Sequence, residues 1–110
     1  MDQAEAFLDL SVIIPVSRAE EALECVSSLS VQNLDKGRFE VVLICNNGEP
    51  FKRKERELNL VIVETDVLHA ATRRNKGAKV AKGKYLVFLD DDTTVSSDWV
   101  SNSIKNLKEH

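Results

Sequence analysis

Four short runs of apolar and β-branched residues form the strongest pattern in the chain, at residues 10–16, 39–45, 60–64 and 85–89. Within each run the apolar residues are consecutive rather than alternating, which is typical of strands covered on both faces in a parallel sheet. The pattern therefore predicts four strands with helices packed on the sheet.

The segment between the first two runs has the spacing of an amphipathic helix. Ser17 followed by Glu20 matches a capping box, in which the two side chains bond free backbone amides at the helix start. Apolar residues then recur along one helical face, at Ala22, Val26 and Leu29. The charged residues 51–58 offer little to bury and predict a short solvated helix or turn.

The two later segments also predict helices. Residues 70–81 are rich in alanine and basic residues, with Gly77 as an interruption and Gly83 as a stop signal. After the fourth run, Ser96 or Ser97 can cap a last helix. The apolar stripe of that helix consists of Val100, Ile104 and Leu107.

Strands and helices alternate along the whole chain, so the expected fold class is α/β, with an open, mostly parallel sheet of about four strands flanked by helices. Right-handed crossovers follow from this order, and ligands of such sheets bind beyond the carboxyl ends of the strands. A length of 110 residues predicts one domain.

Composition narrows the function classes. Hydrophobic residues make up 43% and charged residues 30%, as in ordinary globular domains. The net charge of -3 gives no general attraction to nucleic acid or to anionic membrane surfaces. Cys25 and Cys45 lie in apolar segments and predict buried free thiols, which favours a cytoplasmic location. No apolar run approaches the length of a membrane span.

The fourth apolar run ends in three consecutive carboxylates, Asp90, Asp91 and Asp92. Adjacent carboxylates repel one another, and a divalent cation relieves the repulsion. Magnesium in particular is held by one or two carboxylates together with the phosphates of a substrate. A solvated acidic turn is the alternative interpretation, but one aspartate would satisfy a turn. The pattern therefore favours a metal site.

Two further segments could contact a ligand. Arg73, Arg74 and Asn75 place two guanidinium groups and an amide where a helix start could offer backbone amides to a diphosphate or a base. Basic residues on a helix face are equally typical of a solvated surface. Asn46 and Asn47, followed by glycine, predict a tight turn at a carboxyl strand end, where it could line a nucleotide pocket.

Taken in order, these segments resemble the N-terminal half of glycosyltransferase family 2, which has the GT-A fold. SVIIPV resembles the opening strand of that family, SLSVQ the end of its first helix with Gln32, and VVLICNNG its second strand and turn. The specific part of the resemblance is RRNKGAKVAKGKYLVFLDDD, with an Arg-Asn pair, two glycines and the DxD signature.

The resemblance implies a role for each matching residue. Asp92 would bind the manganese or magnesium ion that bridges the donor diphosphate, with Asp90 beside it near the ribose and Asp91 also in the nucleotide site. Arg74 would lie near the base and phosphates. Pro15 and Val16 would begin the loop that covers the base, and Asn46 would face it.

Asn46 stands where the family usually has an aspartate that accepts a hydrogen bond from uracil. An amide both accepts and donates, so uridine specificity stays open. His69 stands where glycine is common, and Val16, Ser17 and Arg18 replace a usual Thr-Tyr-Asn, so the loops around the base are not typical.

The implied reaction is inverting transfer of a sugar from a nucleotide diphosphate to an acceptor hydroxyl. It requires a general base, which in this family is a carboxylate well downstream of the DxD motif. Asp98 and Glu109 are the carboxylates after Asp92, and both belong to the last helix pattern. We therefore expect a donor-binding domain that is a fragment of a longer glycosyltransferase and not catalytically complete alone.

Three other interpretations deserve a test. LDDDTTV also fits DxDxT, the motif of haloacid-dehalogenase-like phosphatases, with Asp90 as nucleophile and Asp92 as acid, although that motif usually follows a first strand. A dinucleotide-binding domain lacks its Gly-rich fingerprint here. A non-catalytic nucleotide- or partner-binding domain, with self-association through an exposed apolar surface, is the third.

Overall fold

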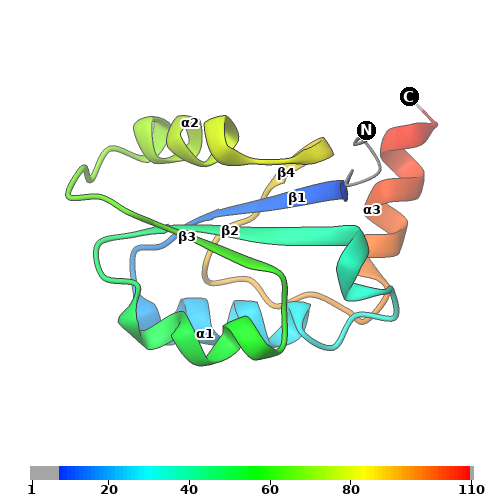
Figure 1. Ribbon diagram of the computed structural model, residues 1–110, viewed down its shortest axis with the longest axis horizontal. Helices are drawn as coiled ribbons and strands as arrows, with labels where there is room; N and C mark the ends of the chain where they lie inside the picture. The colour runs from blue at the N-terminus through cyan, green and yellow to red at the C-terminus, as the bar shows by residue number, and fades with distance from the viewer. Residues whose placement is uncertain (1–7, 110) are drawn as a thin grey trace, which may run out of the picture.

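Strands and helices alternate along the chain in the order that the apolar runs predict. The structure is a computed structural model and describes residues 8–109. The elements are β1 (Leu8–Pro15), α1 (Ala19–Leu29), η2 (Lys36–Arg38), β2 (Phe39–Cys45), η3 (Glu49–Arg56), β3 (Leu60–Glu64), α2 (Ala70–Val80), β4 (Gly83–Phe88) and α3 (Trp99–Lys108), where η marks a 3-10 helix (Figure 1).

The four strands form one parallel sheet in the order β3-β2-β1-β4. The predicted α/β fold with a four-stranded parallel sheet is therefore confirmed. β2 and β3 have the predicted bounds, whereas β1 and β4 each begin two residues earlier than expected. β1 lies between β2 and β4, so the chain leaves it in one direction through α1 and returns to its other side through α2. Such a reversal of strand order opens a crevice at the carboxyl ends of the strands.

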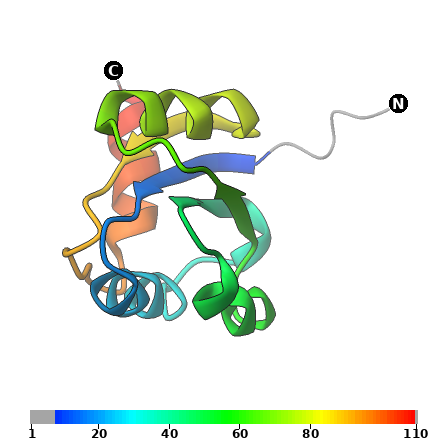
Figure 2. The same cartoon turned by 90° about the vertical axis from the view of Figure 1, so that its left-hand side faces the viewer.

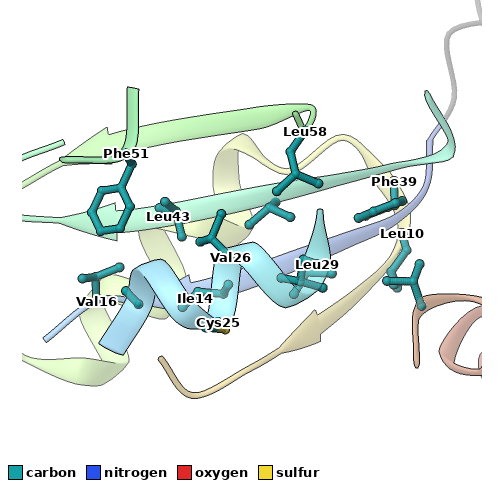
Figure 3. Packing of buried hydrophobic residues seen from close by; sticks show 14 of the residues in the cluster. Leu10, Ile14, Val16, Cys25, Val26, Leu29, Phe39, Leu43, Phe51 and Leu58 are labelled. Carbon is teal, nitrogen blue, oxygen red and sulfur yellow. The ribbon is translucent and has the colours of Figure 1, made fainter. Parts of the chain in front are cut away.

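Helices cover the two faces of the sheet unequally. α1 and η3 lie on one face and α2 on the other, as seen when the carboxyl ends face the viewer (Figure 2). The larger apolar cluster lies on the first face, where β1 and β2 pack against α1, η3 and α3. Its buried members include Leu10, Ile14, Val16, Cys25, Val26, Leu29, Phe39, Leu43, Phe51 and Leu58 (Figure 3).

One expectation about the strands is wrong in part. β2 is buried on both faces, but β4 alternates, because Tyr85 and Val87 pack into the core while Leu86 and Phe88 are 40% and 48% exposed. α2 packs mainly on β1 and β2, so the face of β4 that carries Leu86 and Phe88 stays open. A consecutive apolar run therefore predicts the strand but not the cover over its second face.

Two predicted helix caps are also wrong. α1 begins after Arg18 without a side-chain cap of its own, so Ser17 and Glu20 form no capping box. α3 begins after Asp98 rather than after Ser96 or Ser97, and the Asp98 side chain makes no capping hydrogen bond. Both helices nevertheless bury the predicted apolar stripes, which shows that packing rather than local capping fixes their position.

The glycines of the α2 segment act differently from the prediction. Gly77 lies inside the helix, where an added Cβ would be 2.6 Å from Ile13 and 2.7 Å from Ile44. The missing side chain thus lets α2 lie close on the sheet. Gly83 is the first residue of β4 and does not stop the helix, which ends at Val80. In the part of the chain that the structure describes, every helix is too short or too polar to cross a membrane.

Candidate functional site

The carboxyl ends of all four strands meet at one edge of the sheet, and the predicted site residues follow them. Val16 continues the ladder beyond β1, because its backbone N–H donates to the carbonyl oxygen of Ile44 at 2.8 Å. Asn46 follows β2 directly. The segment Asp90 to Asp92, called the acidic turn below, begins two residues after the end of β4. The topology therefore brings together residues that lie far apart in the sequence.

A pocket of about 390 Å³ opens between the loops that follow β1 and β2. Its volume falls within the usual range for small-molecule sites, about 300–1,000 Å³. Two of the predicted site residues, Val16 and Asn46, line it, whereas Pro15, Arg74 and the aspartates do not. The lining residues are Val16, Ser17, Ala19, Cys45, Asn46, Asn47, Pro50, Phe51, Leu68 and Arg73.

The asparagine turn has the tight geometry that its sequence predicts. The backbone N–H of Gly48 donates to Glu64 Oε2 at 2.8 Å, and the N–H of Glu49 donates to Asn47 Oδ1 at 3.0 Å. An added Cβ on Gly48 would lie 2.5 Å from Ile62, so the turn packs directly on β3. These contacts fix the turn and leave Asn46 exposed beside the pocket.

The acidic turn has two exposed carboxylates, Asp90 and Asp92. The backbone N–H of Thr93 donates to the carbonyl oxygen of Asp90 at 3.2 Å. Cys25 lies beneath the turn, and its Sγ atom is 3.8 Å from the same carbonyl oxygen. Burial, with smaller contributions from the charges of Asp91 and Asp92, raises the pKa of Cys25 to about 12. This buried thiol is therefore protonated at neutral pH, as expected for a core residue.

The central aspartate of the turn faces α1. Asp91 Oδ2 accepts hydrogen bonds from the backbone N–H groups of Ser17 at 2.7 Å and Arg18 at 3.1 Å. A carboxylate at a helix N-terminus satisfies free amides and interacts favourably with the helix dipole. The cap of α1 thus comes from the end of β4 and not from Glu20, which explains why no local capping box forms.

Arg73 is a pocket residue that the sequence interpretation placed only in a general basic segment. Its side chain is buried, and its guanidinium donates to the carbonyl oxygens of Val67 at 2.6 Å and of Val16. Arg74 is exposed. The sequence spacing could have predicted this, because Arg73 lies four residues before Gly77 and both residues therefore face the sheet.

The start of α2 also differs from the prediction. The helix begins at Ala70, and the backbone N–H of Arg73 donates within the helix to His69 at 3.0 Å. The amides at Arg73 and Arg74 are therefore not free to bind a ligand. Only the side chains of this segment can contribute.

Gln32 fixes the segment that follows the acidic turn. Its Nε2 donates to the carbonyl oxygens of Ser28 at 3.1 Å and Ser96 at 2.7 Å, and its Oε1 accepts from the N–H of Val100 at 2.8 Å. The end of α1 is thereby tied to the start of α3. Gln32 has a structural role at the base of the turn.

The carboxylates of Asp90 and Asp92 fit a hard divalent cation in type and number. Among residues 8–109 no group of three potential His, Cys, Asp or Glu ligands is present, and the ion pairs in that range do not include these two residues. Magnesium and manganese sites of substrate phosphates need only one or two carboxylates from the protein. The arrangement thus suits a cation shared with a bound diphosphate.

Comparison with known proteins identifies the family. The sequence model of Glycosyl transferase family 2 matches residues 11–110. The chain belongs to this family. The poly(ribitol-phosphate) beta-glucosyltransferase of Bacillus spizizenii is 28% identical over 93% of this chain and 18% of its own length. The chain thus spans about a fifth of that relative.

Two solved structures of glycosyltransferases share the fold. S. aureus TarS 1-349 in complex with UDP-GlcNAc superposes with a TM-score of 0.83 and 24% identity, over 94% of this chain and 32% of that one. The Pyrobaculum calidifontis mannosyltransferase PcManGT in complex with GDP-Man and Mn2+ gives a TM-score of 0.78 and 24% identity, over 90% and 32%. In each case the matching region makes up about a third of the solved chain.

Proposed function

We propose that this chain binds the nucleotide-diphosphate sugar donor of an inverting glycosyltransferase. The base would occupy the pocket beside Asn46, and the diphosphate would lie at Asp90 and Asp92. The observation that carries this proposal is the hydrogen bond from Ser17 to Asp91, because Ser17 lines the pocket and Asp91 belongs to the acidic turn. Pocket and turn are thus neighbouring parts of one surface.

The complexes of the structural neighbours support this proposal. TarS is solved with UDP-GlcNAc and the Pyrobaculum enzyme with GDP-Man and Mn2+, so proteins of this fold bind nucleotide sugars with different bases. Asn46 is consistent with either base, since its amide both accepts and donates.

A manganese or magnesium ion would be held by Asp92 and Asp90 together with the donor phosphates. When bound, such an ion stabilises the negative charge of the departing diphosphate as a Lewis acid. Asp91 would keep its carboxylate on the amides of Ser17 and Arg18, and so would hold the turn in place rather than bind the cation. Pro15 and Val16 would position the loop next to the base.

We propose that the general base lies in another part of a longer protein. Asp98 is engaged at the start of α3, where its Oδ1 accepts from Ser96 Oγ at 2.7 Å. Glu109 lines a separate cavity together with Leu34 and Arg38. A general base must come within hydrogen-bond reach of the acceptor hydroxyl, and its loss costs a factor of ~10²–10⁴ in rate. Purified alone, the chain should release no more nucleoside diphosphate from labelled sugar nucleotides than an Asp92→Asn control.

We also propose that the chain acts in the cytoplasm and self-associates when isolated. Free buried cysteines support the first proposal, and the open face of β4 with Leu86 and Phe88 supports the second. Sedimentation velocity should show a concentration-dependent dimer that Leu86→Lys with Phe88→Lys abolishes. A monomer at all concentrations would contradict self-association.

Calorimetric titration tests the donor-binding proposal most simply. UDP and GDP are titrated into the chain with and without Mn2+, and at least one should bind only when the ion is present. Asp92→Asn should weaken nucleotide binding in the presence of Mn2+, so that the ion no longer raises the affinity. The exposed surface variant Lys52→Gln serves as a matched control. Absence of binding by both nucleotides in the presence of Mn2+ would contradict the proposed function.

A further inference from the structure

Arg73 is a buried cation at the carboxyl edge of the sheet, with a fractional exposure of 6%. It lies on the face of α2 that Gly77 brings close to the sheet, where the glycine packs on Ile13 and Ile44. The close approach carries the guanidinium over the ends of β1 and β2. Burying an unpaired charge costs free energy, so a buried charge in a protein usually has a counter-charge or binds a ligand.

The contacts of Arg73 leave part of its hydrogen-bonding capacity free. Its Nε donates to the carbonyl oxygen of Val67 at 2.6 Å, and its Nη1 donates to that of Val16. A guanidinium has five N–H donors and no acceptor. Among the described residues, the ion pairs do not include Arg73, so its charge faces no carboxylate within salt-bridge distance.

Arg73 is part of the pocket wall. Arg73 lines the cavity together with Asn46, Asn47 and Ser17, which are neutral. Its charge also acts on Cys45, another lining residue. Burial and the charge of Glu64 raise the pKa of Cys45, and the charge of Arg73 opposes this rise. Arg73 is therefore the single charged group that lines this pocket in the described part of the chain.

We propose that Arg73 determines base specificity by donating a hydrogen bond to a carbonyl oxygen of the donor's base. This inference rests on the proposed function, which puts the diphosphate at the acidic turn and the base in the pocket. A group that only donates requires an acceptor opposite it. Uracil and guanine present carbonyl oxygens, whereas the acceptors of adenine are ring nitrogens set back from the ring edge, so a contact shaped for a carbonyl oxygen would favour the first two over adenine.

Arg73 also holds the pocket walls, and the test must separate this structural effect from base recognition. UDP, GDP and ADP share the ribose, the diphosphate and the cation site, and ADP also shares the purine ring of GDP but presents no carbonyl oxygen on its base. If Arg73 has a purely structural role, its substitution should weaken the binding of all three nucleotides by the same factor. If Arg73 recognises the base, its substitution should weaken the binding of UDP or GDP and leave the binding of ADP unchanged.

Calorimetry with Mn2+ is carried out on the wild-type chain, Arg73→Met, Arg73→Lys and Arg56→Met, a matched control at an exposed arginine away from the pocket. We expect the wild-type chain to prefer UDP or GDP over ADP by about tenfold or more, as one hydrogen bond from a charged donor provides. Arg73→Met should reduce the preference to about one, and Arg56→Met should retain it. Arg73→Lys keeps the charge without the planar fork and should reduce the preference at least in part.

The outcomes separate the two proposals. Binding of no nucleotide by the wild-type chain would contradict the proposed function itself. An unchanged preference in Arg73→Met, or an equal loss for all three nucleotides, would overturn the role of Arg73 alone. If Arg73→Met does not fold, as circular dichroism would show, the preference measured in Arg73→Lys decides by the same criterion.

Discussion

At the amino-terminal edge of the sheet a buried carboxylate has its hydrogen bonds within the protein. Glu40 is 1% exposed, and its Oε2 accepts from Ser11 Oγ and from the backbone N–H of Lys82, both at 2.6 Å. Ser11 Oγ in turn accepts from the N–H of Gly83 at 2.8 Å. We call these four residues the polar clamp; it joins β1, β2 and the start of β4.

The carboxyl edge is organised in the opposite way. Asp90 and Asp92 are exposed, and Arg73, although buried, lines a pocket and uses part of its hydrogen-bonding capacity on two carbonyl oxygens. Within the acidic turn, Asp91 is the carboxylate that is satisfied internally, and it connects this turn to the loop after β1. One edge of the sheet therefore fixes the register of β4, and the turn at its other end is held in place while its polar groups stay exposed.

The largest expected effect comes from breaking the polar clamp through Gly83→Ala. The added Cβ would meet the backbone of Ser11 at 2.5 Å and of Leu10 at 2.6 Å, and backbone atoms cannot move aside cheaply. We expect a loss of about 3 kcal/mol in unfolding free energy, the upper end for overpacking, measured by urea denaturation. Gly37→Ala is the matched control, since its Cβ would meet only Asp35 Oδ1 at 3.5 Å. Equal stability of the two variants would contradict this packing.

Removing the carboxylate should have the next largest effect. Glu40→Ala leaves the hydroxyl of Ser11 and the amide of Lys82 without their acceptor, which costs about 2 kcal/mol in unfolding free energy. Glu40→Gln keeps an oxygen for both donors and should cost less. The same denaturation series measures both, and a Gln variant as unstable as the Ala variant would rule out this role of the carboxylate oxygen.

At the carboxyl edge, substitutions of two neighbouring aspartates should affect stability and nucleotide binding separately. Asp92→Asn should leave the unfolding free energy unchanged but weaken Mn2+-dependent nucleotide binding about tenfold or more, as expected for a lost contact to a charged partner. Asp91→Ala should do the reverse and cost about 1 kcal/mol of stability, because it uncaps α1. Calorimetry and urea denaturation on both variants measure the two effects. Equal effects of the two changes would show that the turn does not divide its roles in this way.

The smallest expected effect is at Asn46. Asn46→Asp replaces a group that accepts and donates by one that only accepts, and should improve binding of UDP relative to GDP by about 1 kcal/mol, one hydrogen bond. Titration of both nucleotides into the two proteins measures it. Unchanged UDP binding would exclude a contact between Asn46 and the base.

Much of the fold was predictable from local pattern, because apolar runs and helical stripes report burial directly. The residue pattern located the acidic turn and the asparagine turn, and the family resemblance implied their roles. The capping of α1 by Asp91 was not predictable, since the two partners lie more than seventy residues apart. The spacing to Gly77 indicates that Arg73 rather than Arg74 faces the sheet, but how deeply Arg73 is buried depends on how closely Gly77 lets α2 approach the sheet.

Nuclear magnetic resonance with a paramagnetic ion tests most directly whether pocket and acidic turn form one donor site. Backbone amide spectra are recorded with UDP or GDP and Mg2+, and Mn2+ is then added in small amounts. We expect the nucleotide to shift the amides of Ser17 and Asn46, and Mn2+ to broaden those of Asp90 to Thr93 first. Broadening centred elsewhere, with the acidic turn unaffected while nucleotide is bound, would contradict a shared site for cation and diphosphate at the end of β4.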